Sequence, residues 1–546
     1  MIRFRKNKLK KILVFGVLIF IINRSFSQVT PPPAATGKPD SIKIVKILST
    51  DRYGYKKIDS LTELLLLVGH VALQQESTIF YSDSAVFNKN AKIVEAFKHV
   101  HINDNDSVNI YSDYLLYHTD TKIATLKKNV RLTDSKSNLY TDELVYDVNQ
   151  KTGVYSKGGK VINGTSVLTS QEGTYYSDIK DVYFKKNVTL KDPKYNLTTD
   201  SLLYNTTSQI ATFITKTYIE DSAKRIITTS DGYYDLKNKN ASFGKRPVIK
   251  DGATTTTANQ VVTDDVTGRS ILTGNAIFKD TAQGISVLSN YIVTDKNKGS
   301  LIATEKPLLI IKQEKDSTFI TADSLYSGKF SELPVFMDSP AVEDAALKKA
   351  AVINTSDSSL RFFRAYHNVR IFSDSMQAVC DSLFYSGKDS IFRLFYNPII
   401  WASNSQVTGD TIYLYTKNKK PDLMRVFENG LMINKTGIDM YNQIKGNRLF
   451  GYFVKGEINN VRAKGNAESI YYAKDGQEKL IGINKANSDI IDMRFKNKEL
   501  NRVVFISAVT GTMFPVNEAT DEDKRLRSFK WLEDKRPKSK FELFGN

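Results

Sequence analysis

The chain has 546 residues and a formal net charge of +18, with 77 Lys and Arg against 59 Asp and Glu. This excess of positive charge favours anionic partners such as phosphorylated lipids or polyanionic glycans. Lysines at strand edges also block edge-to-edge aggregation, so the charge has a functional and a purely structural interpretation, and both stay open. The single cysteine, Cys380, excludes an intramolecular disulfide. Nucleic acid is not an expected partner, because the first residues predict export.

Residues 1–27 predict a cleavable signal peptide. The basic stretch MIRFRKNKLKK precedes an apolar stretch of 11 residues, ILVFGVLIFII, and SFS at 25–27 places small residues where a signal peptidase would cut. This stretch is shorter than the about 20 apolar residues that span a bilayer. We therefore expect cleavage after Ser27 and a mature protein in the periplasm, or associated from there with the outer membrane. Residues 28–42 form a Pro-rich linker.

From residue 80 onward a short element returns about every 29 residues. It combines an apolar residue, a small residue, an acidic or amide residue, a Leu, Val or Ile, and a Tyr or Phe, as in LYTDELVY at 139–146 and LTTDSLLY at 197–204. A second element runs in phase with it, a Gly, Asn or Lys followed by a short alternating strand, as in NVRL at 129–132. A fixed period of this length indicates a stacked array of repeats.

Alternating polarity and many Val, Ile, Thr, Tyr and Phe residues predict strands almost throughout. The best helical window, 339–352, falls where the ladder skips one period. We therefore expect an elongated all-β body of about 13 repeats with a short helical insertion. Its expected parts are a first repeat block at 43–335, an insertion or joint at 336–356, a second repeat block at 357–480, and a C-terminal cap with a charged tail at 481–546.

Apolar residues within one repeat predict a corner in the strand. Leu139, Thr141, Leu144 and Tyr146 are spaced 2, 3, 2, whereas strict alternation would send Leu139 and Leu144 to opposite faces. Both leucines face inward only if the strand has a bulge or corner at Thr141–Asp142, where the Asp142 side chain would cap the turn. The same reasoning predicts an outward structural ladder of corner residues: Asp83, Asp113, Asp142, Asp200, Asp323, Asp381 and Asp410.

Motifs for catalysis or metal binding do not occur. The five histidines lack a spacing such as HExxH, no GxSxG or Walker loop is present, and the Gly-rich nonapeptides of calcium-binding β-rolls are absent. We therefore expect no catalytic residues, no enzyme activity, no metal and no cofactor. A carboxylate pair, as in glycan-cleaving β-helices, stays as an alternative because every repeat offers an Asp.

Inward apolar positions form a continuous stripe along the array. If the two faces of the sheet close tightly, the stripe is the core of a closed solenoid, a scaffold or docking protein of the cell envelope. If the faces splay apart, it lines a trough for acyl chains. The candidate lipid-lining residues are Ile110, Leu115, Leu132, Leu139, Leu144, Leu190, Leu197, Leu202, Ile320, Leu325, Ile371 and Leu383.

The segments NVRLTDSKSNLYTDELVYD at 129–147, NVTLKDPKYNLTTDSLLYN at 187–205 and NVRIFSDSMQAVCDSLFYS at 368–386 resemble the OstA-like or LptA family of periplasmic lipopolysaccharide-transport proteins, in its long multi-repeat form. The resemblance covers about residues 60–475. It implies a β-jellyroll of two sheets in a V that shields the acyl chains of lipopolysaccharide or a related glycolipid. The partners it implies are other jellyroll transport components, an outer-membrane barrel, and further copies of the chain joined head to tail. The resulting prediction is a non-enzymatic periplasmic lipid carrier or bridge.

Overall fold

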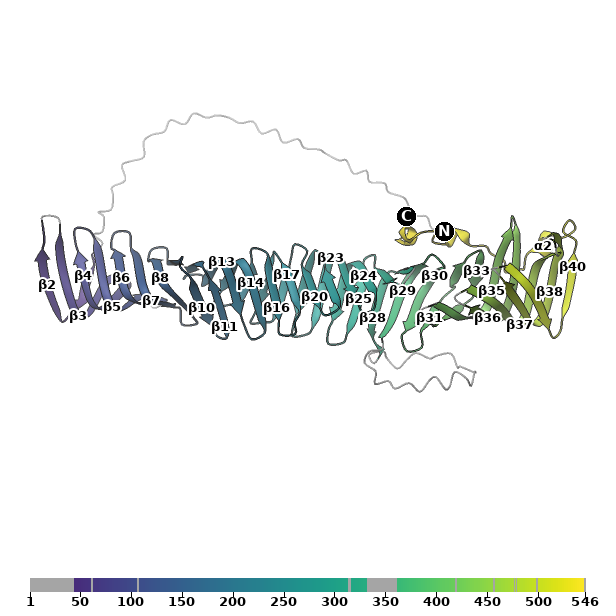
Figure 1. Cartoon of the computed structure of the whole chain (residues 1–546), viewed down its shortest axis with the longest axis horizontal. Coiled ribbons are helices and arrows are strands. Elements are labelled where there is room, and N and C mark those ends of the chain that lie inside the picture. The colour runs from purple at the N-terminus through teal and green to yellow at the C-terminus, as the bar shows by residue number, and fades with distance from the viewer. Residues whose placement is uncertain are drawn as a thin grey trace, which may run out of the picture.

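The computed structural model describes residues 44–59, 62–105, 108–312, 316–330, 361–417, 420–454, 457–475, 477, 479–496 and 499–544. These residues form a long rod in which strands stack along one axis (Figure 1). All 40 strands join one hydrogen-bonded sheet, so the predicted elongated all-β repeat fold is confirmed. The expected signal peptide at 1–27, the linker at 28–42 and the helical window at 339–352 lie outside the described residues.

The strands up to residue 205 are β1 (Lys46–Ser49), β2 (Arg52–Lys57), β3 (Glu63–Gln75), β4 (Thr78–Asn88), β5 (Ile93–Asp104), β6 (Val108–His118), β7 (Ile123–Thr133), β8 (Ser137–Asp147), β9 (Thr152–Tyr155), β10 (Gly159–Asn163), β11 (Ser166–Ser170), β12 (Glu172–Tyr176), β13 (Asp181–Lys191) and β14 (Tyr195–Asn205). The next strands are β15 (Ile210–Phe213), β16 (Thr217–Asp221), β17 (Ile226–Thr229), β18 (Gly232–Asp235), β19 (Asn240–Phe243), β20 (Val248–Asp251), β21 (Thr254–Thr257), β22 (Gln260–Asp264), β23 (Arg269–Asp280), β24 (Ile285–Asp295), β25 (Ser300–Thr304), β26 (Leu308–Lys312), β27 (Ser317–Thr321) and β28 (Ser324–Lys329). The remaining elements are β29 (Arg361–Phe372), β30 (Gln377–Ser386), β31 (Ile391–Phe395), β32 (Ile399–Ala402), β33 (Ser405–Thr408), β34 (Thr411–Lys417), β35 (Lys420–Gly437), β36 (Met440–Val454), β37 (Glu457–Lys474), β38 (Leu480–Lys496), β39 (Glu499–Ile506), β40 (Thr510–Phe514), α2 (Asp521–Lys524) and the 3-10 turns η2 (Glu533–Lys535) and η3 (Lys540–Phe544).

Alternate long strands, such as β5, β7, β13 and β29, bend at a corner made by two consecutive left-handed residues. Between β7 and β8 the register shifts so that Lys128 and Asn129 together stand opposite Asp142. Their φ angles are 64° and 54°, a backbone region that Asn tolerates better than most residues. The corners at Lys98–His99 and His367–Asn368 have the same conformation. The residues before each NVxL strand therefore bend the sheet.

This row of corners folds the sheet lengthwise into two arms. We call arm 1 the half that contains Leu132 and Leu139, and arm 2 the half that contains Leu126 and Leu144. Leu139 and Leu144 are both buried in one core cluster, although they stand five positions apart in the same strand. The corner therefore turns both sets of apolar residues inward, as the 2, 3, 2 spacing predicts.

The aspartates of the predicted corner ladder lie on the outside of the bend. Six of the seven are exposed and Asp381 is half-buried. The carboxylate of Asp113 accepts a hydrogen bond of 2.6 Å from the Asn129 side chain of the next strand, and Asp410 accepts one from Asn429. These bonds hold neighbouring corners in register.

The chain end returns along the rod. Residues 519–544 lie over the outer face of arm 1 from β38 back to β27 and β29 (Figure 1). Gln443 and Gln406 each bind this strap twice, donating to the carbonyls of Lys524 and Lys530 and accepting from the N–H groups of Leu526 and Leu532. The strap thereby buries a second apolar cluster on the outer face. Among the described residues no helix has the length and apolar character to cross a membrane.

Candidate functional site

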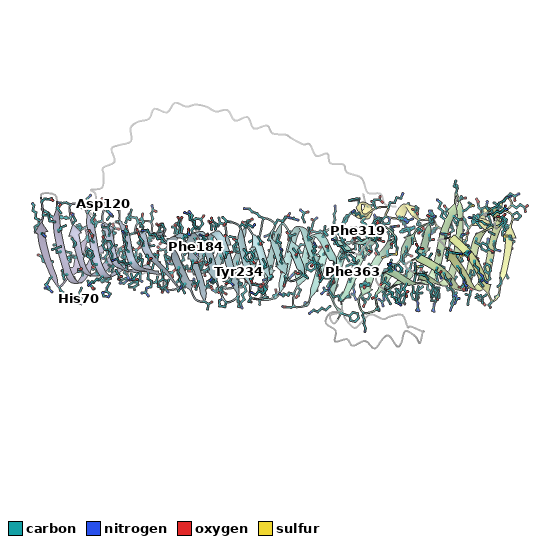
Figure 2. The ribbon with its side chains drawn as sticks, viewed as in Figure 1. His70, Asp120, Phe184, Tyr234, Phe319 and Phe363 are labelled. Atoms are coloured by element: carbon teal, nitrogen blue, oxygen red, sulfur yellow. The ribbon has the colours of Figure 1, made fainter. Side chains whose placement is uncertain are left out.

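A large groove opens between the two arms in the middle of the rod. Its volume is about 2410 Å³, and its lining residues run from Lys194 to Glu457. Apolar side chains of both arms form its floor, and several of them, including Phe278, Ile311 and Phe363, are only partly buried (Figure 2 labels Phe363). Small-molecule sites usually measure about 300–1,000 Å³, so the groove is large enough for an extended apolar ligand.

The groove's edges are polar hairpin turns. We call the opening between the hairpins of arm 1 and those of arm 2 the mouth. Figure 2 labels His70, at a corner, and Asp120, in an arm 2 hairpin, on opposite edges of the rod. The apolar floor and the charged mouth together give the groove an amphipathic cross-section, which suits a ligand with apolar chains and a polar head.

Before the groove, in the part of the rod up to residue 206, tyrosines close the mouth. The Tyr146 hydroxyl, at the tip of arm 2, donates a hydrogen bond of 2.6 Å to Asp104 at the tip of arm 1. Tyr175 donates to Asp134 at 2.8 Å in the same way, and Tyr117 donates to Gln75. All of these side chains are buried, so the two arms meet without a gap at these bonds. We call Tyr117, Tyr146 and Tyr175 the mouth tyrosines.

The electrostatics keep these bonds formed. Burial, followed by the carboxylate of Asp104, raises the pKa of Tyr146 well above its ordinary value, so the phenol remains a donor. Burial alone would raise the pKa of Asp134, but hydrogen bonds from the Ser137 backbone N–H and from the Tyr175 and Thr206 hydroxyls outweigh it and lower that pKa. The closure of Tyr175 on Asp134 therefore pairs a neutral donor with an ionised acceptor, which is the stronger kind of hydrogen bond.

Where the groove begins, the mouth position carries short side chains. The residues that occupy the place of Tyr146 in the first repeats of the groove are Thr263, Thr294 and Ser327, and all three line it, as does Tyr385 in the same place of a later repeat. A threonine or serine hydroxyl lies much closer to its own backbone than a phenol does, so it does not reach the opposite arm. The groove thus opens at the repeats whose mouth residues are Thr263, Thr294 and Ser327.

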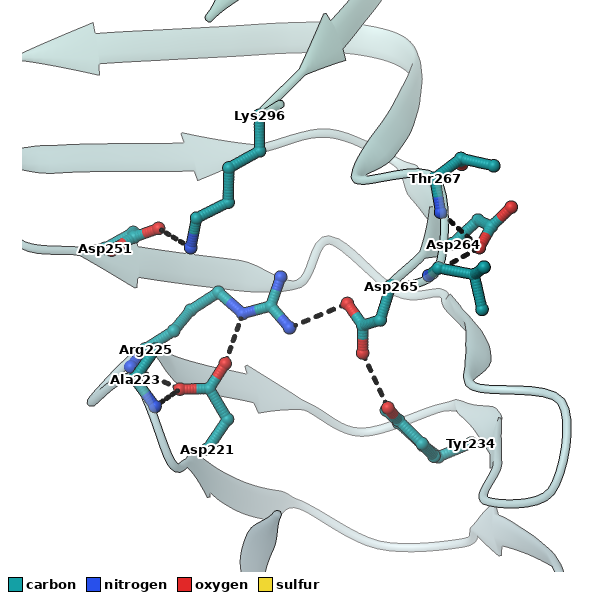
Figure 3. A network of polar contacts seen from close by, with 10 residues as sticks. Asp221, Ala223, Arg225, Tyr234, Asp251, Asp264, Asp265, Thr267 and Lys296 are labelled. Atoms are coloured by element: carbon teal, nitrogen blue, oxygen red, sulfur yellow. Dashed lines mark hydrogen bonds and ion pairs between the residues drawn. The ribbon is translucent and has the colours of Figure 1, made fainter. Parts of the chain in front are cut away.

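Ion pairs span the mouth where the groove begins (Figure 3). Arg225 of arm 1 contacts Asp265 of arm 2 at 3.0 Å, and Lys296 of arm 2 contacts Asp251 of arm 1 at 3.2 Å. Burial would lower the pKa of Arg225, but Asp265 and Asp221 outweigh it and raise that pKa. These carboxylates are therefore paired with cations across the mouth.

Comparison with known proteins identifies the first part of the chain. Residues 43–200 match the family model of the OstA-like protein. Residues 43–200 are therefore an OstA-like region. A solved structure that it resembles is LptH, the LptA-homologous periplasmic component of the conserved lipopolysaccharide transport device from Pseudomonas aeruginosa, with 14% identity and a TM-score of 0.18 over 20% of this chain and 80% of that chain. No curated protein matches the chain.

The matched OstA-like region and the groove occupy different parts of the rod. The region ends at residue 200, whereas the groove lining begins at Lys194. The mouth tyrosines all lie inside the OstA-like region, and the short mouth residues Thr263, Thr294 and Ser327 all lie after it. The closed and the open part of the protein thus divide near the end of this region.

The predicted lipid-lining residues are all buried, but most lie outside the groove. Ile320, Leu325 and Ile371 line it. The others are packed in the core without lining it: Ile110, Leu115, Leu132, Leu139, Leu144, Leu190, Leu197, Leu202 and Leu383. Sequence reasoning did not find the half-buried floor residues Phe278, Ile311 and Phe363, although the change from Tyr to Thr or Ser at the mouth position was a readable signal.

Neither a metal site nor a reactive thiol is found among the described residues. Within the described residues no group of three or more His, Cys, Asp or Glu side chains is arranged to hold a metal ion. Cys380 is buried, and burial raises the pKa of its thiol to about 12, which keeps it protonated at neutral pH. This thiol therefore packs in the core as a small apolar side chain.

Proposed function

We propose that this protein is a periplasmic, non-enzymatic component of lipopolysaccharide transport, and that its groove shields the acyl chains of lipopolysaccharide or a related glycolipid. The observation that carries the proposal is the open apolar floor, in which Phe278, Ile311 and Phe363 remain partly exposed. Apolar surface of this extent in an open groove favours a bound apolar ligand. The OstA-like region supports the same assignment.

Burial of acyl chains would supply the affinity. Each methylene group removed from water contributes about 0.8 kcal/mol, so the affinity grows with every methylene group that the floor covers. At the mouth, Lys194 of arm 1 and Lys239 of arm 2 both line the opening, and the ammonium group of Lys239 lowers the pKa of Lys194. An anionic head group between these two lysines would relieve their repulsion.

The ends of the rod provide surfaces for partners. At the first end β1 and β2 are exposed along their whole length, and among the described residues they pair only with β3. At the other end β39 and β40 pair, within the same described part of the chain, only with β38. Exposed edge strands bind further strands by β-augmentation, so other jellyroll components, an outer-membrane barrel partner or a second copy of the chain would dock here.

The test is to purify the mature protein from a lipopolysaccharide-producing cell and to measure bound glycolipid by native mass spectrometry and lipid extraction. We expect stoichiometric glycolipid, and we expect Ile311→Asn and Phe363→Asn to reduce it, because they place a polar group on the floor. Ile302→Asn is the matched control, since Ile302 is 43% exposed on the outer face of β25. A lipid-free protein that also fails to take up added lipopolysaccharide would refute the proposal.

A further inference from the structure

We infer that the lipid site is closed at one end and is confined to the groove after Tyr234. The rod from residue 62 to about 206 has a filled interior that no acyl chain enters. This inference rests on the proposed function, because it says where along the rod the ligand lies. It also assigns the start of the open stretch to the change of the mouth residue from tyrosine to threonine at Thr263.

Two tyrosines form the end wall of the groove. Tyr195 of arm 1 and Tyr234 of arm 2 both line it, and their rings meet across the interior with centroids 4.6 Å apart. The Tyr234 hydroxyl donates to Asp265, which also holds Arg225 of the opposite arm (Figure 3). The wall is therefore fixed to the first ion pair that spans the mouth.

Behind this wall the interior is filled. The void next to Tyr195 and Tyr234 measures about 10 Å³, which is close to the least volume that holds one water molecule. Beyond it, Phe184, Leu202 and Leu190 are at most 1% exposed. A polymethylene chain has no space to continue in this direction without separating the two arms.

Separating the arms would break the closures described above. The bonds of Tyr146 to Asp104 and of Tyr175 to Asp134 would both be lost, and a buried carboxylate would face the acyl chain each time. Lys122 adds a further closure, since its buried side chain reaches Glu76 at 2.6 Å. Burial of an ionised group against hydrocarbon is strongly unfavourable, so these repeats exclude lipid by their chemistry as well as by their packing.

A ligand therefore enters through the mouth from the side and not by sliding along the whole rod. The open stretch begins where the mouth position changes from tyrosine to Thr263, Thr294 and Ser327. The closed stretch would then serve to set the distance between the groove and whatever binds the exposed first strands of the rod.

Two phenylalanines give a matched test (Figure 2). Both belong to arm 2 and are labelled in the figure: Phe184 is fully buried in the closed stretch, and Phe363 lines the groove floor. The full mature protein would carry p-azidophenylalanine at position 184 or 363, be loaded with purified lipopolysaccharide, and be irradiated. We expect a glycolipid adduct at position 363 and none above background at position 184, with unchanged circular dichroism for both proteins.

The outcomes separate the two proposals. An adduct at position 184 equal to or stronger than that at 363 would overturn the inference and leave the proposed lipid carrier intact. No adduct at either position would overturn the proposed function itself. A second test inserts a mouth tyrosine: Thr294→Tyr should lower the adduct at position 363, whereas Val293→Tyr, on the outer face of the same strand, should not. An unchanged adduct in Thr294→Tyr would contradict the role assigned to the mouth position.

Discussion

Tyr146 and Tyr204 occupy the same place in their repeats, but replacing each of them with Phe should change the stability of the protein differently. Tyr146 and Tyr204 are both fully buried at the tip of arm 2. The Tyr146 hydroxyl donates to the buried carboxylate of Asp104 at 2.6 Å, whereas the Tyr204 hydroxyl has no hydrogen-bond partner in the part of the chain that the structure describes. Tyr146→Phe therefore removes a hydroxyl that makes a hydrogen bond, whereas Tyr204→Phe removes a buried hydroxyl that makes none.

The expected magnitudes follow from the hydrogen bond. A bond to a charged group contributes about 1.5–3 kcal/mol, and Tyr146→Phe also leaves Asp104 with one donor fewer in a buried site. We therefore expect Tyr146→Phe to lower the free energy of unfolding by about 1.5–3 kcal/mol. Tyr204→Phe removes an unpaired buried hydroxyl, so it should leave stability unchanged or raise it by up to about 1–3 kcal/mol.

Urea unfolding followed by circular dichroism would measure both effects, and amide hydrogen exchange would place them along the rod. Local measurement matters because stacked repeats unfold in units and not always as one body. Tyr140→Phe serves as a surface control, since Tyr140 is 40% exposed on the outer face of β8. Equal destabilisation by Tyr146→Phe and Tyr204→Phe would show that the phenols act by packing alone and would refute the reasoning.

Further predictions concern pH, the corners and the strap. Because the folded-state pKa of Asp134 is lowered, the stability it contributes is fully present above its unfolded pKa of about 3.9 and is lost as the pH falls through the lower folded value. The stability difference between wild type and Asp134→Asn should thus be constant from neutral pH to about pH 5 and shrink below about pH 4 in pH-dependent thermal unfolding; a difference that persists at pH 3 would contradict this. Asn129→Val should destabilise by about 1–3 kcal/mol more than Asn129→Gly, because both lose the hydrogen bond to Asp113 but only the β-branched residue is strained at φ 54°; similar urea midpoints for the two would argue against a strained corner. Gln443→Ala should release the strap, seen as faster proteolysis after Lys524, because the carbonyl of Lys524 and the N–H of Leu526 lose their partner; wild-type cleavage rates would show that the apolar cluster alone holds it.

The sequence by itself determined the architecture of the rod. The period of about 29 residues predicts stacking, and the 2, 3, 2 spacing of Leu139, Thr141, Leu144 and Tyr146 predicts the corner, because both are local patterns that report which side chains face inward. The double left-handed turn at Lys128–Asn129 was not predicted. Its signal was present in the second repeated element, whose first residue is Asn129 in NVRL at 129–132 and His99 in HVHI at 99–102.

Only the tertiary structure decided where the interior is open. Leu144 and Leu325 occupy the same place in their repeats and both are buried, yet only Leu325 lines the groove. The difference arises at the mouth, where Tyr146 reaches Asp104, which is 42 positions earlier and on the other arm, and where Ser327 reaches no such partner. Alternation along a strand determines which side chains face inward, but the distance between two arms depends on contacts between residues far apart in the chain. Those contacts became visible only when the sheet was folded.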